Sequence, residues 1–230
     1  MLGLMLLLLS TFGLGYFYCK NTVDAIGLMP NRNRIVLFGG GFLFASILVL
    51  LNCLIESSIF SAEWKLNDSV NFSLLGKAIQ YFFISALTEE LIFRGILLYI
   101  LTDKTGIQKA ALISAAAFGI YHWFSYGMFG NEIIPMLYIF LITSLAGYVW
   151  GIAFVKSKTI LLPLVLHFGW NLISSLVQKS QPYGEIIFHQ VSKAALSDLN
   201  KLFASLFMGI FPSILMYIAL YLMFRKKKVL

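Results

Sequence analysis

The sequence predicts an all-α fold, a polytopic helical membrane protein with about seven transmembrane helices, within a range of six to eight, and a buried cavity. Of its 230 residues, 60% are hydrophobic and only 12% are charged, and the mean hydropathy is +0.86. Soluble domains are roughly half apolar and a quarter charged, so this composition excludes an ordinary soluble protein. The apolar runs also lack the regular alternation of a membrane β-barrel.

Seven apolar runs are each long enough, at about 20 residues, to cross the roughly 30 Å of bilayer hydrocarbon as a helix. They cover residues 1–18, 35–55, 78–102, 110–126, 133–155, 160–177 and 202–224. The first run ends on bulky aromatic residues rather than on a cleavage site, so we expect it to be retained as a helix. With no linker or repeat between the runs, residues 1–230 are predicted to form a single integral-membrane domain. The mainly polar stretch 181–201 is predicted to be an interfacial helix.

The basic residues predict the orientation of these helices. With the N-terminus outside, eleven basic residues lie on the inner side of the membrane and five lie in outer loops. The positive-inside rule therefore predicts an external N-terminus and a cytoplasmic C-terminus. Because the net charge of +7 is scattered between apolar runs, the lipid bilayer is the expected partner and nucleic acid is excluded.

Three charged residues, Glu89, Glu90 and Arg94, fall inside a predicted span, where each costs a few kcal/mol. At 100° per residue Arg94 lies one turn from Glu90 on the same face, whereas Glu89 points away. We therefore expect Glu90 and Arg94 to form an ion pair. Glu89 is left without a cation on its own helix, and desolvation would make it a stronger general base. The alternative is that all three residues only tie helices together.

Two further polar groups occupy other spans. Phe118 and His122 lie one turn apart in the run 110–126, and His167 and Asn171 lie one turn apart in the run 160–177. His167 and Asn171 can donate hydrogen bonds to the oxygen of a polarised carbonyl, as an oxyanion hole does. Taken alone, a histidine such as His122 more often forms an interhelical hydrogen bond than a catalytic site. All of these groups can lie near mid-membrane, so the sequence predicts that they meet.

Together these motifs resemble the CPBP family of intramembrane proteases, which includes CAAX prenyl endopeptidases and Abi-type bacteriocin-processing or self-immunity proteins. The resemblance covers roughly residues 78–176, and its motifs occur in the order of the family. They are EExxxR at Glu89, Glu90 and Arg94, FxxxH at Phe118 and His122, and HxxxN at His167 and Asn171. The family commonly has eight spans, one more than the runs counted above.

The resemblance implies an intramembrane endopeptidase in the bacterial cytoplasmic membrane, with the buried cavity as its active site. Its substrate would be a membrane-embedded or lipid-anchored peptide or protein, in CAAX-type processing, peptide maturation or bacteriocin self-immunity. Glu89 and His122 would activate water, while His167 and Asn171 would stabilise the oxyanion. Glu90 and Arg94 would have a supporting role.

A zinc ion is one open question. Glu89, His122 and His167 would make a catalytic zinc set with an open position. The sequence has no HExxH motif, however, and asparagine is a poor zinc ligand, so we favour hydrolysis without a metal. Two other functions are considered: a catalytically silent immunity or regulatory protein on the same scaffold, and a proton-coupled transporter. The transporter is disfavoured because no broken helices are predicted in paired halves.

Overall fold

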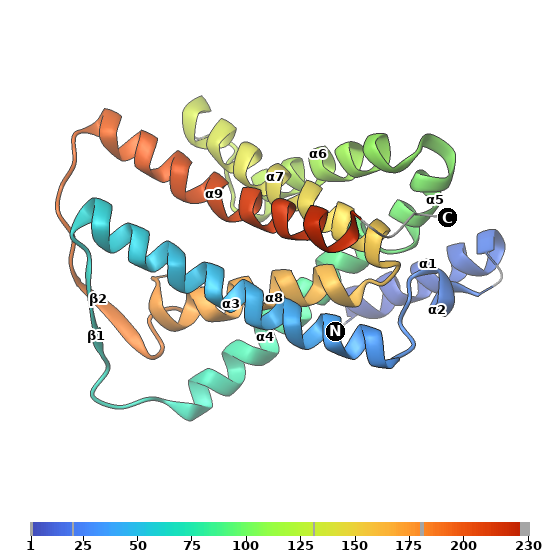
Figure 1. The fold of residues 1–230 in the computed structure, drawn as a ribbon, viewed down its shortest axis with the longest axis horizontal. Helices are drawn as coiled ribbons and strands as arrows, with labels where there is room; N and C mark the ends of the chain where they lie inside the picture. Colours follow the sequence, from blue (N-terminus) through green and yellow to red (C-terminus); the bar gives the residue numbers. More distant parts are fainter. Residues whose placement is uncertain (1, 20, 131, 180–181, 226–230) are drawn as a thin grey trace. The chain divides into compact units, whose positions relative to one another are not determined.

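The computed structural model describes residues 2–19, 21–130, 132–179 and 182–225, and most of them are helical (Figure 1). The helices are α1 (Leu2–Cys19), α2 (Thr22–Ala25), α3 (Arg32–Phe60), α4 (Phe72–Phe93), α5 (Ile96–Thr105), α6 (Ile107–Ser125), α7 (Ile133–Ser157), α8 (Leu161–Val177) and α9 (Asp198–Phe224). Two short strands, β1 (Glu63–Leu66) and β2 (Phe188–Ser192), complete the fold. The prediction of a helical membrane protein is confirmed.

Helix length and composition agree with a membrane location. Within the described residues, α3, α7 and α9 are long and apolar enough to cross a bilayer, and α8 and the part of α1 from Leu7 to Cys19 are shorter apolar helices. The predicted runs 35–55, 110–126, 133–155, 160–177 and 202–224 coincide with α3, α6, α7, α8 and α9. The orientation of the termini stays a prediction.

The predicted span 78–102 is wrong as a single helix, because it is divided into α4 and α5 at Arg94 and Gly95. Gly95 has a ψ of −142°, outside the helical region, and a Cβ atom there would lie 2.3 Å from the carbonyl oxygen of Leu91. Only glycine fits so close to the preceding turn. The hydroxyl of Ser114 donates a 2.7 Å hydrogen bond to the carbonyl of Phe93, at the end of α4.

The chain divides into two compact units. The first contains Met1–Phe38, Thr88–Leu164 and Ser213–Leu230, and the second contains Gly39–Leu87 and Val165–Pro212. In the first unit α6 and α7 approach closely at Gly119, where a Cβ atom would lie 2.0 Å from the hydroxyl of Ser144. In the second, α8 approaches α3 at Gly169, where a Cβ atom would lie 3.1 Å from that of Ala45. Small residues thus permit close helix contact in both units.

The two-stranded sheet in the second unit was not predicted. β1 and β2 pair antiparallel, with Leu66 opposite Phe188 and Lys65 opposite His189 (Figure 1). The expected interfacial helix over 181–201 is therefore wrong within the described residues, since this segment contains β2 and α9 begins only at Asp198. The strand forms because β1, more than 100 residues earlier in the chain, supplies its hydrogen-bonding partner.

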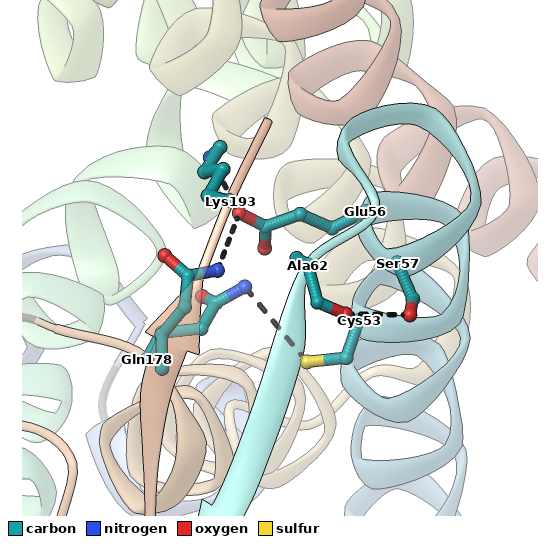
Figure 2. A network of polar contacts seen from close by, with 7 residues as sticks. Cys53, Glu56, Ser57, Ala62, Gln178 and Lys193 are labelled. Carbon is teal, nitrogen blue, oxygen red and sulfur yellow. Dashed lines mark hydrogen bonds and ion pairs between the residues drawn. The ribbon is translucent and has the colours of Figure 1, made fainter. Parts of the chain in front are cut away.

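A network of polar contacts connects the segment around β2 with the end of α3 (Figure 2). The carboxylate of Glu56 accepts hydrogen bonds from Nζ of Lys193 at 2.6 Å and from Nε2 of Gln190 at 3.4 Å. Glu56 is buried, and the Lys193 ammonium also lies 4.2 Å from the ring centroid of Phe60. A buried acid on α3 is thus neutralised by a lysine that follows β2.

Candidate active site

Glu90 and Arg94 form a buried ion pair at the end of α4. Nη1 of Arg94 lies 3.2 Å from Oε1 of Glu90, and both side chains are fully buried. This is the (i, i+4) pair that the helical spacing predicts. A buried charge requires such a partner, because removing an isolated ion from water costs several kcal/mol.

Aromatic rings surround the Arg94 guanidinium. Its central carbon lies 4.1 Å from the ring centroid of Phe118 on α6, 5.4 Å from that of Trp150 on α7 and 5.6 Å from that of Phe93. The negative faces of aromatic rings attract a cation, most strongly where water is excluded. The buried charge of Arg94 is therefore stabilised by a carboxylate and by aromatic side chains from three helices.

Gly147 on α7 makes room for this arrangement. A Cβ atom at this position would lie 2.9 Å from Nη2 of Arg94 and 2.9 Å from Cδ1 of Phe118. Any larger residue would displace the guanidinium or the ring. This role of Gly147 was not predicted from the sequence, where its only signal is a glycine inside an apolar helical run.

His122 is held against Phe118 in two ways. Its Nδ1 lies 2.8 Å from the carbonyl oxygen of Phe118, and the two ring centroids lie 4.4 Å apart in an edge-to-face arrangement. A carbonyl oxygen can only accept, so Nδ1 carries the proton that is donated in this hydrogen bond. In the neutral imidazole the lone pair is therefore on Nε2, the nitrogen that is able to accept a proton.

Glu89 and Glu90 have different surroundings, as the helix geometry predicts. Glu90 is fully buried, whereas Glu89 is only partly buried. Glu89 lies one helical turn before Phe93, whose ring packs against Phe118 at 5.1 Å and Tyr121 at 5.4 Å between centroids. Glu89 lies about one turn before Phe93 and His122 lies about one turn after Phe118, so both are near the contact between these two rings. The first unit contains the acid and the histidine on helices that touch.

His167 and Asn171 lie on α8 in the second unit, one turn apart. His167 is buried and Asn171 is partly buried. The neighbouring Phe168 packs against Phe42 of α3 and Phe83 of α4, with ring centroids 5.9 Å and 5.5 Å apart. This packing and the close approach at Gly169 fix the rotation of α8 within its unit.

The candidate residues were also tested for their fit to a metal ion. Among the described residues, neither unit by itself gathers three His, Cys, Asp or Glu side chains that are able to hold one. In the first unit the fully buried carboxylate of Glu90 is bound to Arg94. The donor set of either unit alone, within the described residues, does not fit a zinc site.

In a comparison with known protein families, one region of the chain matches a family model. Residues 71–173, a little under half of the sequence, match the family described as type II CAAX prenyl endopeptidase Rce1-like. The matched region contains Glu89, Glu90, Arg94, His122, His167 and Asn171. Comparisons with curated proteins and with solved structures gave no match.

Proposed function

We propose that this chain, part of which matches a family of CAAX prenyl endopeptidases, is an intramembrane protease of the CPBP family and hydrolyses its substrate with a water molecule activated by Glu89 and His122. The observation that carries the proposal is the division of labour between two adjacent acids. Glu90 is fully buried and ion-paired with Arg94, while Glu89, on a different face of α4, is only partly buried. A general base must be accessible to the water that it deprotonates.

The proposed reaction begins when water approaches the scissile carbonyl. Glu89 takes a proton from the water as its oxygen forms a bond to the carbonyl carbon, and Nε2 of His122 accepts a hydrogen bond from the same water. The carbon–nitrogen bond then breaks, and the proton held by Glu89 passes to the leaving amine. The products are a new carboxylic acid and a free amine, and the acid passes its proton to the amine at neutral pH, so no oxidant, reductant or covalent intermediate is required.

His167 and Asn171 are proposed to hold the oxyanion of the tetrahedral intermediate. An imidazole N–H and an amide N–H₂ are donors of the kind that stabilises developing negative charge when they are fixed in advance. This assignment is supported by the family match, which covers Glu89, His122, His167 and Asn171.

Glu90 and Arg94 are proposed to be positioning residues. Arg94 contacts Phe118, and Phe118 in turn accepts the hydrogen bond from Nδ1 of His122 and packs against its ring. The buried ion pair thus acts on the reaction through the orientation of His122. It contributes rigidity rather than a proton.

The substrate class is proposed from the description of the family. A lipid-anchored peptide with a CAAX-type C-terminus is the first substrate to test, because a site on membrane helices receives its substrate from the bilayer. A role in peptide maturation or bacteriocin self-immunity would require cleavage of an unprenylated membrane peptide instead. Prenylated and unprenylated forms of one peptide, compared in the same vesicles, distinguish the two.

The test uses the full chain reconstituted in lipid vesicles, with cleavage followed by mass spectrometry. Glu89→Gln and His122→Ala should each lower turnover by at least about a hundredfold, the usual contribution of general acid–base catalysis. Glu132→Gln, an exposed acid next to α7, is the matched control and should cleave like the wild type. Retained turnover in both site variants would exclude the mechanism, and a wild type that never cleaves would favour a silent immunity protein.

A further inference from the structure

A concave site lies in the first unit, apart from the proposed catalytic residues. It is a cavity of about 530 Å³, formed where the end of α1, α2, α5, the start of α6 and the end of α7 come together. This volume lies in the range, roughly 300–1,000 Å³, of sites that bind small molecules. The part contributed by α1 and α2 also lies outside the region that matches the family.

The depth of the cavity in the membrane follows from the helices that form it. Cys19 is the last residue of the apolar helix α1, and Lys158 directly follows α7, one of the helices able to span the bilayer. Both residues line the cavity. Because these apolar helices end there, the cavity lies where hydrocarbon gives way to lipid headgroups.

The lining carries charges of both signs. Asp24 on α2 and Asp103 on α5 contribute carboxylates, and Lys158 contributes an ammonium. The hydroxyl of Tyr18 donates a 2.7 Å hydrogen bond to Oδ2 of Asp103, and Nδ2 of Asn21 donates one of 2.5 Å to Oδ2 of Asp24. These bonds orient the carboxylates but use only part of their capacity, because an ionised carboxylate has about four acceptor positions.

Part of the remaining wall of the cavity is apolar. It includes Phe154 and Val155 on α7 and Ile107 at the start of α6. A ligand that suits this lining has a cationic group, an anionic group and an apolar part, and it is present at the level of the headgroups. A phospholipid with a zwitterionic headgroup has all of these properties.

We propose that this cavity binds a phospholipid with a primary-ammonium headgroup, phosphatidylethanolamine. Its ammonium lies between Asp24 and Asp103, its phosphate pairs with Lys158, and its glycerol and upper acyl carbons contact Phe154 and Val155. A primary ammonium offers three N–H donors to the two carboxylates, as the lysine side chain does. The quaternary ammonium of phosphatidylcholine offers none, so the site discriminates between two lipids of equal charge.

The proposal is tested with the purified full chain in detergent micelles that contain equal amounts of phosphatidylethanolamine, phosphatidylcholine and phosphatidylglycerol. Native mass spectrometry counts the lipids retained by the protein. The wild type should retain phosphatidylethanolamine about tenfold more than phosphatidylcholine. This preference corresponds to a difference of about 1.4 kcal/mol in binding free energy. Equal retention of the three lipids would overturn the proposal.

Variants assign the contacts. Asp24→Asn combined with Asp103→Asn should abolish the preference for phosphatidylethanolamine, and Lys158→Gln should lower the retention of all three lipids. Should the double variant fail to fold, Asp24→Asn alone replaces it, because Asp24 is exposed and its substitution is compatible with folding. This single variant should still reduce the preference for phosphatidylethanolamine several-fold. Glu132→Gln is the control and should bind like the wild type. An unchanged preference in folded aspartate variants would contradict the assignment.

A competition experiment separates a lipid site from a site for a soluble headgroup. Glycerophosphoethanolamine has the same charges but no acyl chains, so it cannot fill the apolar wall. At a concentration equal to that of the lipid it should leave the bound phosphatidylethanolamine in place. Displacement would show that the charged groups alone determine binding, and it would overturn the lipid proposal.

Discussion

Removal of one partner of the buried Glu90–Arg94 pair should destabilise the protein strongly. Arg94→Met leaves the Glu90 carboxylate without its cation in a position that has no exposure at all. Loss of one member of a buried ion pair costs about 3–5 kcal/mol, because the other charge remains buried. Arg94→Met also removes the contact with Phe118, worth about 2 kcal/mol for a desolvated cation.

The double variant Glu90→Leu with Arg94→Met should recover most of that loss. Both buried charges are then absent, and apolar replacement of a buried pair is often neutral or stabilising. A double-mutant cycle should therefore give a coupling free energy of at least about 3 kcal/mol between the two positions.

The assay is equilibrium unfolding of the purified protein in mixed micelles, followed by tryptophan fluorescence, with cleavage activity measured on the same samples. Since the pair is proposed to position His122 rather than to react, the folded double variant should keep measurable cleavage. A double variant whose loss of stability equals the sum of the two single losses would refute the ion-pair reasoning. A stable double variant as inactive as Glu89→Gln would refute the positioning role.

Three further predictions concern Gly147, Glu56 and the role of a metal ion. Gly147→Ala should cost about 1–3 kcal/mol in thermal unfolding, because its Cβ would lie 2.9 Å from the Arg94 side chain; Gly151→Ala, one turn further along α7 and 3.6 Å from its nearest neighbour, should be neutral or stabilising. Glu56→Gln should lower the free energy of unfolding by about 1–3 kcal/mol, because it removes the charge that pairs with Lys193, and an unchanged melting temperature would contradict this role. Prolonged chelation followed by metal analysis should leave cleavage intact, whereas a loss that zinc restores would contradict metal-free hydrolysis.

The sequence predicts the helical architecture and the separation of Glu89 from Glu90, because both depend on the period of one helix. The pairing of Phe118 with His122 follows from the same period. Which nitrogen of His122 carries the proton cannot be predicted from this period, because it depends on the position of the Phe118 carbonyl oxygen. The contact of Arg94 with Trp150 likewise depends on how α7 packs.

The division of the third predicted span and the strand β2 could not be predicted, for different reasons. Glycine is common inside membrane helices, so Gly95 gives no local sign of a break. The break depends on the hydroxyl of Ser114, which binds the carbonyl of Phe93 from another helix. β2 contains too few residues for a clear alternation, and its pairing partner β1 lies far away in the sequence. Both features are set by tertiary contacts rather than by local preference.

The central claim is that Glu89 and His122, which both lie in the first unit, activate the same water molecule. It is tested most directly by single-turnover cleavage rates of Glu89→Gln, His122→Ala and the variant that carries both changes. Residues that act together in one site are strongly non-additive, so the double variant should be about as slow as the slower single variant. Reductions that multiply would show that the two residues act independently, and this result would contradict a single site.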